Sequence, residues 1–232
     1  MRRGYFECRH GQLHVHNAIP PGGGFEEATA LLCLHQGAAS GRTFTRFLSV
    51  MGHDRSVYAP DLPGCGESDP PPSRPGVPEY AAAIGDFLDA MRFRQIDVLG
   101  HRSGSLIAAE LAVARPQQIR RVVMVGVPVL NEAEREAVKR SSRPPPATDD
   151  GRHVTGEWSV SAAVSYPVQE RLVAIGQPVF VLRPKDDLWE PTARVREFLP
   201  KARYLDVPEH GQTLFEQSPD VAARALKDFL AS

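Results

Sequence analysis

The stretch Leu-Gly-His-Arg-Ser-Gly-Ser (residues 99–105) joins a short apolar run to a helical pattern that is apolar on almost every side. Small residues on both sides of a central residue are typical of a sharp, strained turn from a strand into a helix. Gly100 and Gly104 centre this turn on Arg102. Moving the centre to Ser103 would leave neither glycine in place. The stretch therefore predicts a buried strand, a tight turn with Arg102 at its apex, and a helix.

Strand-length apolar runs, bounded by turn residues, alternate with helical patterns along the chain. The runs are Ala30–Leu34, Val57–Ala59, Ile96–Leu99, Val122–Val125, Val179–Leu182 and Tyr204–Val207. Such alternation predicts an α/β fold with a mostly parallel sheet and helices on both faces. Two further segments flank His10-Gly11 and predict an antiparallel hairpin at the sheet edge. We therefore expect an eight-stranded sheet.

One segment interrupts this alternation. About fifty residues separate Val125 from Val179, which is too many for a simple crossover. They include a helical pattern over Asn131–Arg140, followed by three consecutive prolines. We expect a core made of residues 1–127 and 178–232, with residues 128–177 forming a short lid over the sheet.

Composition and charge exclude several classes of protein. The net charge of −1 favours neither nucleic acid nor an anionic membrane as partner, and no apolar run is long enough to span a bilayer. No apolar segment follows the two arginines near the N-terminus, so we expect no signal peptide. Three scattered cysteines without metal-ligand spacing indicate a reducing compartment. We expect a cytoplasmic protein without a cofactor, and the sequence leaves its oligomeric state open.

Four stretches, taken in order and at their spacing, resemble the α/β-hydrolase superfamily over nearly the whole chain. They are Leu34–Gly37, Asp61–Ser68, Leu99–Ser105 and Pro184–Asp187. The resemblance implies the α/β-hydrolase fold, with a site at the carboxyl ends of the strands beneath the lid. It also implies an oxyanion hole built from the backbone amides of Ser103 and of Gln36 or Gly37.

The chain departs from this family at two catalytic places. Arg102 stands where the family carries its nucleophilic serine, and Gln212 stands where it carries histidine. Asp187 remains at the place of the acid. Arginine is not a nucleophile and glutamine accepts no proton near neutral pH, so these positions cannot form a serine-histidine-acid triad. A less characterised branch of the superfamily resembles the chain in its His-Gln pair, its altered elbow and the lid element Asp150–His153.

Each candidate site residue has a functional and a structural interpretation. Arg102 would clamp a substrate carboxylate or phosphate, or form an ion pair with Asp187. Ser103 would be a displaced nucleophile with His210 as its base, although a serine in the first turn of a helix is the simpler interpretation. The remaining candidates for substrate contacts are His35, Gln36, Gly37 and Gln212.

Histidines offer two possible metal groupings, and we favour neither. His35, His101 and His210 could join Asp187 around zinc, but in the family the first two normally pack and hydrogen-bond the loops. Alternating histidines at positions 10, 14 and 16 are more typical of one face of an edge strand. We expect no metal site.

Two functional hypotheses follow. The leading one is a small-molecule enzyme that hydrolyses an ester or a carbon–carbon bond of an acyl or carboxylate-bearing substrate, with help from Asp187, His210 or Ser103. The competing one is a non-catalytic protein that binds a ligand or partner in the former active-site pocket. Contact between His210 and a carboxylate would favour the enzyme, whereas Arg102 tied to Asp187 would favour the binding protein. Either way we expect a small-molecule partner, which can be anionic.

Overall fold

The computed structural model describes residues 1–23, 28–141 and 156–231. Within these ranges eight strands form one sheet with the order β1-β2-β4-β3-β5-β6-β7-β8. The strands are β1 (Arg2–Cys8), β2 (Gly11–Ala18), β3 (Leu31–Leu34), β4 (Val57–Pro60), β5 (Ile96–His101), β6 (Ile119–Val125), β7 (Val179–Pro184) and β8 (Arg203–Val207). β1 and β2 form the predicted hairpin, β2 runs antiparallel to β4, and all other pairs are parallel. The predicted fold class is confirmed.

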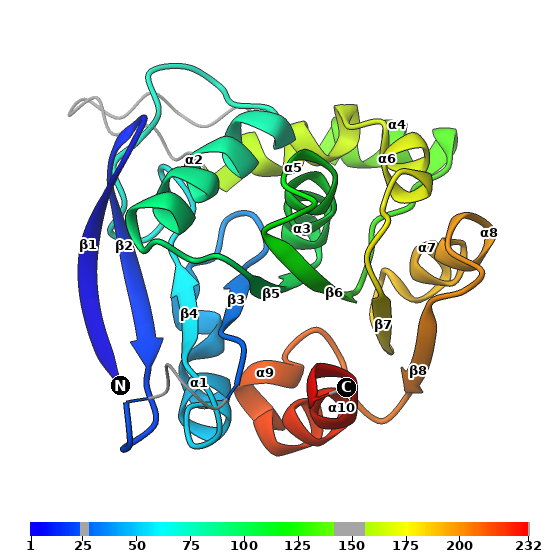
Figure 1. Cartoon of the computed structure of the whole chain (residues 1–232). Helices are drawn as coiled ribbons and strands as arrows, with labels where there is room; N and C mark the ends of the chain where they lie inside the picture. Colours follow the sequence, from blue (N-terminus) through cyan, green and yellow to red (C-terminus); the bar gives the residue numbers. More distant parts are fainter. Residues whose placement is uncertain (24–27, 142–155, 232) are drawn as a thin grey trace.

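Helices cover both faces of the sheet (Figure 1). One face carries α2 (Val77–Ala90) and α3 (Ser103–Ala114), and the other carries α1 (Thr45–Met51), α9 (Leu214–Gln217) and α10 (Pro219–Ala231). Successive strand residues point to opposite faces. In β6, Val122 and Met124 accordingly join one apolar cluster, and Val123 and Val125 join the other. This two-sided burial explains why the central strands have continuous apolar sequences.

Helix α2 shows how the sequence specifies these layers. The side chains of Tyr80, Ile84 and Phe87 recur at helical spacing and are almost fully buried against the sheet. At the N-terminus the carboxylate of Glu79 accepts a hydrogen bond of 2.9 Å from the amide of Gly76, which satisfies one amide before the helix. The apolar stripe and the cap together fix where α2 begins and which face it buries.

The segment expected to form the lid contains three described helices. They are α4 (Glu132–Ser141), α5 (Gly156–Ser165) and α6 (Val168–Val173). Helix α4 matches the helical pattern predicted over Asn131–Arg140. The element Asp150–His153 lies outside the described residues, and the lid boundaries at 128 and 177 remain a prediction.

Short helices also lie in the connections between strands. They are the 3₁₀ helix η1 (Gly41–Phe44), α7 (Trp189–Ala193) and α8 (Val195–Phe198). Among the described residues, no helix combines the length and the apolar character that a membrane crossing requires.

Candidate functional site

The turn between β5 and α3 has Arg102 at its apex. The backbone of Arg102 has φ 55° and ψ −119°, in a region that residues other than glycine rarely adopt. Its amide donates a hydrogen bond of 2.7 Å to the carbonyl of Val125 on the neighbouring strand β6. Such a conformation costs about 1–3 kcal/mol and persists only where the surroundings enforce it. Ser103, one residue later, is the first residue of α3.

The two flanking glycines make this turn possible because there is no room for a side chain at either position. A Cβ atom on Gly104 would lie 2.2 Å from the carbonyl oxygen of Leu34 on β3. A Cβ atom on Gly100 would lie 2.3 Å from the carbonyl oxygen of Gly104. The close approach of strand and helix therefore requires glycine at both places, and the turn is centred on Arg102.

The guanidinium of Arg102 lies between two carboxylates that follow β7. Its Nη1 atom donates to Asp186 Oδ2 at 3.0 Å and to Asp187 Oδ1 at 2.9 Å, and its Nη2 atom donates to Asp187 Oδ2 at 2.8 Å. Arg102 thus forms the ion pair with Asp187 that the sequence offered as the structural interpretation. It also pairs with Asp186, which the sequence analysis did not single out.

The two aspartates differ in their surroundings. The side chain of Asp186 is 5% exposed and that of Asp187 is 67% exposed. Burial raises the pKa of Asp186, whereas the hydrogen bonds from Arg102 lower the pKa of Asp187. Asp186 also accepts a hydrogen bond of 2.8 Å from the amide of Leu188. Asp186 is therefore the fixed partner of Arg102, and Asp187 is the one that solvent or a ligand can replace.

Ser103 faces the loop that follows β3. Its Oγ atom accepts a hydrogen bond of 2.7 Å from the amide of Gly37. Gly37 is one of the amides that the sequence assigned to an oxyanion hole, so this donor is already engaged by the serine side chain. An activated serine would in addition donate its proton to a base. Among the described residues, no base forms a hydrogen bond with Ser103 Oγ.

His210 and Gln212 lie in the loop between β8 and α9. The backbone of His210 accepts a hydrogen bond of 2.6 Å from the amide of Lys185, which ties this loop to the end of β7. The ring of His210 is half-buried and forms no hydrogen bond with any described residue. Gln212 is exposed, and neither residue lines the pocket at the elbow.

His35 and His101 are both buried and have structural surroundings. The ring of His35 contacts the carbonyl of Gln36 through Nδ1 at 2.7 Å and accepts a hydrogen bond from the amide of Leu62 through Nε2 at 2.9 Å. The ring of His101 packs against Phe215 with 5.3 Å between centroids, and burial lowers its pKa to about 3. With both nitrogens of His35 engaged, the described residues do not form the zinc group of His35, His101, His210 and Asp187.

A pocket of about 280 Å³ lies above the elbow. Its polar floor consists of Gln36, Gly37, Arg102, Ser103 and Asp187, and its other described lining residues are mainly apolar: Pro128, Leu130, Val138, Ala163, Val164 and Leu188. Apolar walls with a few polar groups at one end are typical of a site for a small ligand. Four predicted site residues besides Arg102 thus share this floor, whereas His35, His210 and Gln212 do not.

The fold and the elbow geometry can now be compared with known proteins. The family model described as the alpha/beta hydrolase fold matches residues 29–149. The chain belongs to this family. The matched residues run from β3 through the elbow and α4, so the α/β-hydrolase match includes the altered turn.

Curated relatives of this α/β hydrolase align over short stretches. The chain is 29% identical over 96 residues to an uncharacterised protein of Mycobacterium tuberculosis, covering 41% of this chain and 28% of that protein. It is 35% identical over 82 residues to a 2-hydroxymuconate semialdehyde hydrolase of a Pseudomonas species, covering 33% of this chain and 27% of that enzyme. The alignments thus span less than a third of these relatives' length.

Solved structures match this α/β hydrolase over its whole length. The enol-lactonase of Burkholderia xenovorans superposes with a TM-score of 0.80 at 14% identity, covering 99% of this chain and 100% of that one. A hydrolase of Pseudomonas aeruginosa gives a TM-score of 0.80 at 18% identity, covering 100% and 99%. Identities this low show a shared fold alone.

Sequence reasoning missed the contribution of Asp186. The two neighbouring aspartates gave no signal in the sequence, because which one is buried depends on how the chain turns after β7. In the structure the amide of Asp186 donates to the carbonyl of Pro184 at 3.0 Å, and its carboxylate turns inward to Arg102 and the amide of Leu188.

Proposed function

We propose that this α/β hydrolase binds a small, largely apolar carboxylate-bearing ligand in the pocket above the elbow, without serine-hydrolase chemistry. The observation that carries the proposal is the strained apex of the elbow, which Arg102 occupies and where Asp186 and Asp187 hold its guanidinium. The hydrolases among its relatives make a small organic molecule the natural class of ligand.

The contacts of Ser103 and His210 argue against the hydrolytic hypothesis. Nucleophilic catalysis requires a base within hydrogen-bond reach of the serine hydroxyl. Among the described residues no base forms a hydrogen bond with Ser103 Oγ, and the ring of His210 forms none with any of them. By the criterion drawn from the sequence, the absence of a described carboxylate partner for His210 and the ion pair of Arg102 with Asp187 favour the binding protein.

The ligand chemistry follows from the unequal partners of Arg102. The pair with Asp187 is exposed, and exposed pairs contribute only about 0–1 kcal/mol. A ligand carboxylate can therefore displace Asp187 from the Nη2 atom at low cost, while Asp186 keeps the guanidinium in place. The apolar part of the ligand would then contact Leu130, Val164 and Leu188 in the pocket wall.

The test compares hexanoate with methyl hexanoate by isothermal titration calorimetry. We expect hexanoate to bind more tightly, because only the acid has a carboxylate for Arg102. Asp187→Asn should strengthen hexanoate binding about two- to fivefold by removing the competing carboxylate. Arg102→Gln should weaken it at least about tenfold, the loss expected for a hydrogen bond to a charged group.

Matched controls distinguish binding of the ligand carboxylate by Arg102 from a general effect of the substitutions on folding. Methyl hexanoate binding should be the same in wild type and Asp187→Asn, and circular dichroism should show all three chains folded at the assay temperature. Equal affinity for acid and ester in the wild type, or no binding of either, would contradict the proposal.

A further inference from the structure

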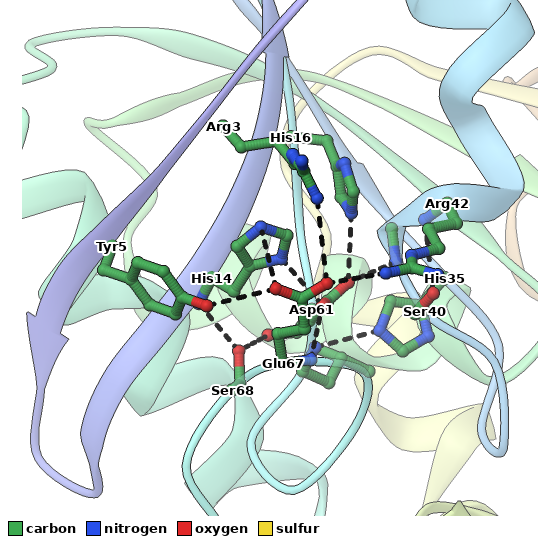
Figure 2. A network of polar contacts seen from close by, with 12 residues as sticks. Arg3, Tyr5, His14, His16, His35, Ser40, Arg42, Asp61, Glu67 and Ser68 are labelled. Carbon is green, nitrogen blue, oxygen red and sulfur yellow. Dashed lines mark hydrogen bonds and ion pairs between the residues drawn. The ribbon is translucent and has the colours of Figure 1, made fainter.

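Two buried histidines and a buried aspartate meet where β2 passes the loop after β4 (Figure 2). His14 and His16 are alternate residues of β2 and share one side of the strand. Asp61 directly follows β4, which pairs with β2 in antiparallel fashion. The three side chains are each at most 3% exposed, and their potential ligand atoms lie within 4.8 Å of one another. None of the three lines the pocket above Arg102.

The carboxylate of Asp61 is held in a fixed orientation. Its Oδ1 atom accepts a hydrogen bond of 2.7 Å from the amide of Gly41, and its Oδ2 atom accepts one of 2.9 Å from the amide of Glu67. Nδ1 of His14 lies 2.9 Å from the same Oδ2 atom. Each carboxylate oxygen offers two acceptor sites, so Oδ1 keeps one site free of these contacts.

His16 is the unsatisfied member of the group. Neither nitrogen of its buried ring forms a hydrogen bond with a described residue, although one of them carries a proton. Its Nε2 atom lies 3.8 Å from Asp61 Oδ1, which is too long for a hydrogen bond. Two ligands at about 2.1 Å from one tetrahedral zinc ion are separated by about 3.4 Å. The separation therefore fits a shared metal ion better than a direct contact.

Glu67 lies near the outer ring nitrogen of His14. Its Oε2 atom lies 3.8 Å from Nε2 of His14, the ring nitrogen that faces away from Asp61. A histidine that binds a metal through one nitrogen commonly presents the other to a carboxylate. The hydroxyl of Tyr5 donates to Glu67 at 3.1 Å, and Arg42 donates to it at 2.6 Å.

The positive charges near the group are balanced locally. Arg42 forms its ion pair with Glu67 Oε1, and Arg3 lies 3.9 Å from the same atom (Figure 2). Among the described residues no arginine pairs with Asp61, whose close titratable neighbours are His14 and His16.

We propose that His14 Nδ1, His16 Nε2 and the carboxylate of Asp61 form a binding site for one divalent transition-metal ion of the zinc class. Imidazole and carboxylate ligands suit zinc. Binding requires the proton of His14 to move from Nδ1 to Nε2, the nitrogen that lies 3.8 Å from Glu67 Oε2. The ion would join the β1–β2 hairpin to the loop after β4. This site departs from the sequence-based expectation, which assigned these histidines to a strand face.

The test is zinc binding to the full-length chain after treatment with a chelator, measured by competition with a chromophoric chelator. We expect one zinc ion per chain, and at least about 100-fold weaker binding in His16→Ala, because loss even of an outer partner of a ligand costs 10–100-fold. His53→Ala removes an exposed histidine outside the group and should bind as the wild type does. Cobalt in the wild type should give the strong visible absorption of a tetrahedral site.

A measurement on the wild type alone covers the case in which His16→Ala fails to fold. Long-range proton–nitrogen spectra should show zinc shifting the ring nitrogens of two histidines among the eight in the chain. Equal zinc affinity in the wild type and in His16→Ala would overturn the proposal. Absence of a one-to-one complex, or zinc shifts at other histidines only, would overturn it as well.

Discussion

Replacing Arg102 by alanine removes the counter-ion of a buried carboxylate. Asp186 is 5% exposed and depends on Arg102 for charge compensation, whereas Asp187 is 67% exposed and can be solvated. Removing one partner of a fully buried pair costs about 3–5 kcal/mol. Because Arg102 is itself 16% exposed, we expect a smaller loss of about 2–4 kcal/mol in the free energy of unfolding. Alanine retains the backbone strain at φ 55°, so the loss reports on the side chain.

Urea unfolding of a double-mutant cycle separates the two carboxylates. The coupling between Arg102 and Asp186, measured with Asp186→Asn, should be about 2 kcal/mol or more. The coupling with Asp187, measured with Asp187→Asn, should be about 0.2–1 kcal/mol, as for other exposed pairs. The expected order of the two couplings follows from burial, since both carboxylates contact the guanidinium at similar distances.

The pH dependence of the stability of Arg102→Ala provides an independent test of the pair with Asp186. Burial already raises the pKa of Asp186, and loss of the arginine raises it further. A carboxyl whose folded-state pKa lies above its unfolded value contributes stability at low pH that is lost as the pH rises through that pKa. The variant should therefore lie closer to wild type near pH 5 than near pH 7.5. Equal couplings for the two aspartates, or a deficit that grows as the pH falls, would refute this reasoning.

Three further predictions concern the residues around the elbow. Ser103→Ala removes the acceptor of the Gly37 amide and should lower the free energy of unfolding by about 0.5–1.5 kcal/mol in urea titrations. His101 has a pKa of about 3 because of burial, so the native chain loses stability as the pH falls below about 6.5, where the unfolded histidine takes up a proton. In His101→Leu the free energy of unfolding should fall less steeply with decreasing pH, by about 1.4 kcal/mol per pH unit between about pH 6 and pH 4. An unchanged slope would contradict the lowered pKa of His101. Gly104→Ala places a methyl group 2.2 Å from the carbonyl of Leu34 and should give little soluble, folded protein on expression, whereas a wild-type melting temperature would show that the turn is looser than described.

The fold was predictable because its signals are local. Each apolar run lies between turn residues, and the helical stripe of α2 is visible without knowledge of its neighbours. The sequence predicted an eight-stranded, mostly parallel sheet, and the structure has eight strands in the described residues. Helix boundaries differ by a residue or so, as at α4, which spans Glu132–Ser141 where the sequence predicted Asn131–Arg140.

The site was less predictable because its contacts join distant segments. The elbow register is local and could be deduced from Gly100 and Gly104. Which of two adjacent aspartates would be buried against Arg102 depends on the turn after β7, 84 residues further along the chain. The group of His14, His16 and Asp61 likewise depends on the pairing of β2 with β4, so alternation of histidines along one strand could not reveal it.

The central claim is that this α/β hydrolase binds its ligand without serine-hydrolase chemistry. The most direct test is to expose the native chain to a fluorophosphonate probe and to measure its intact mass. Wild type and Ser103→Ala would be compared, with an active serine hydrolase as the positive control. Because Arg102 occupies the apex of the elbow and no base among the described residues forms a hydrogen bond with Ser103 Oγ, we expect no adduct on either chain. A stoichiometric adduct on the wild type that is lost in Ser103→Ala would contradict the account and identify Ser103 as an activated nucleophile.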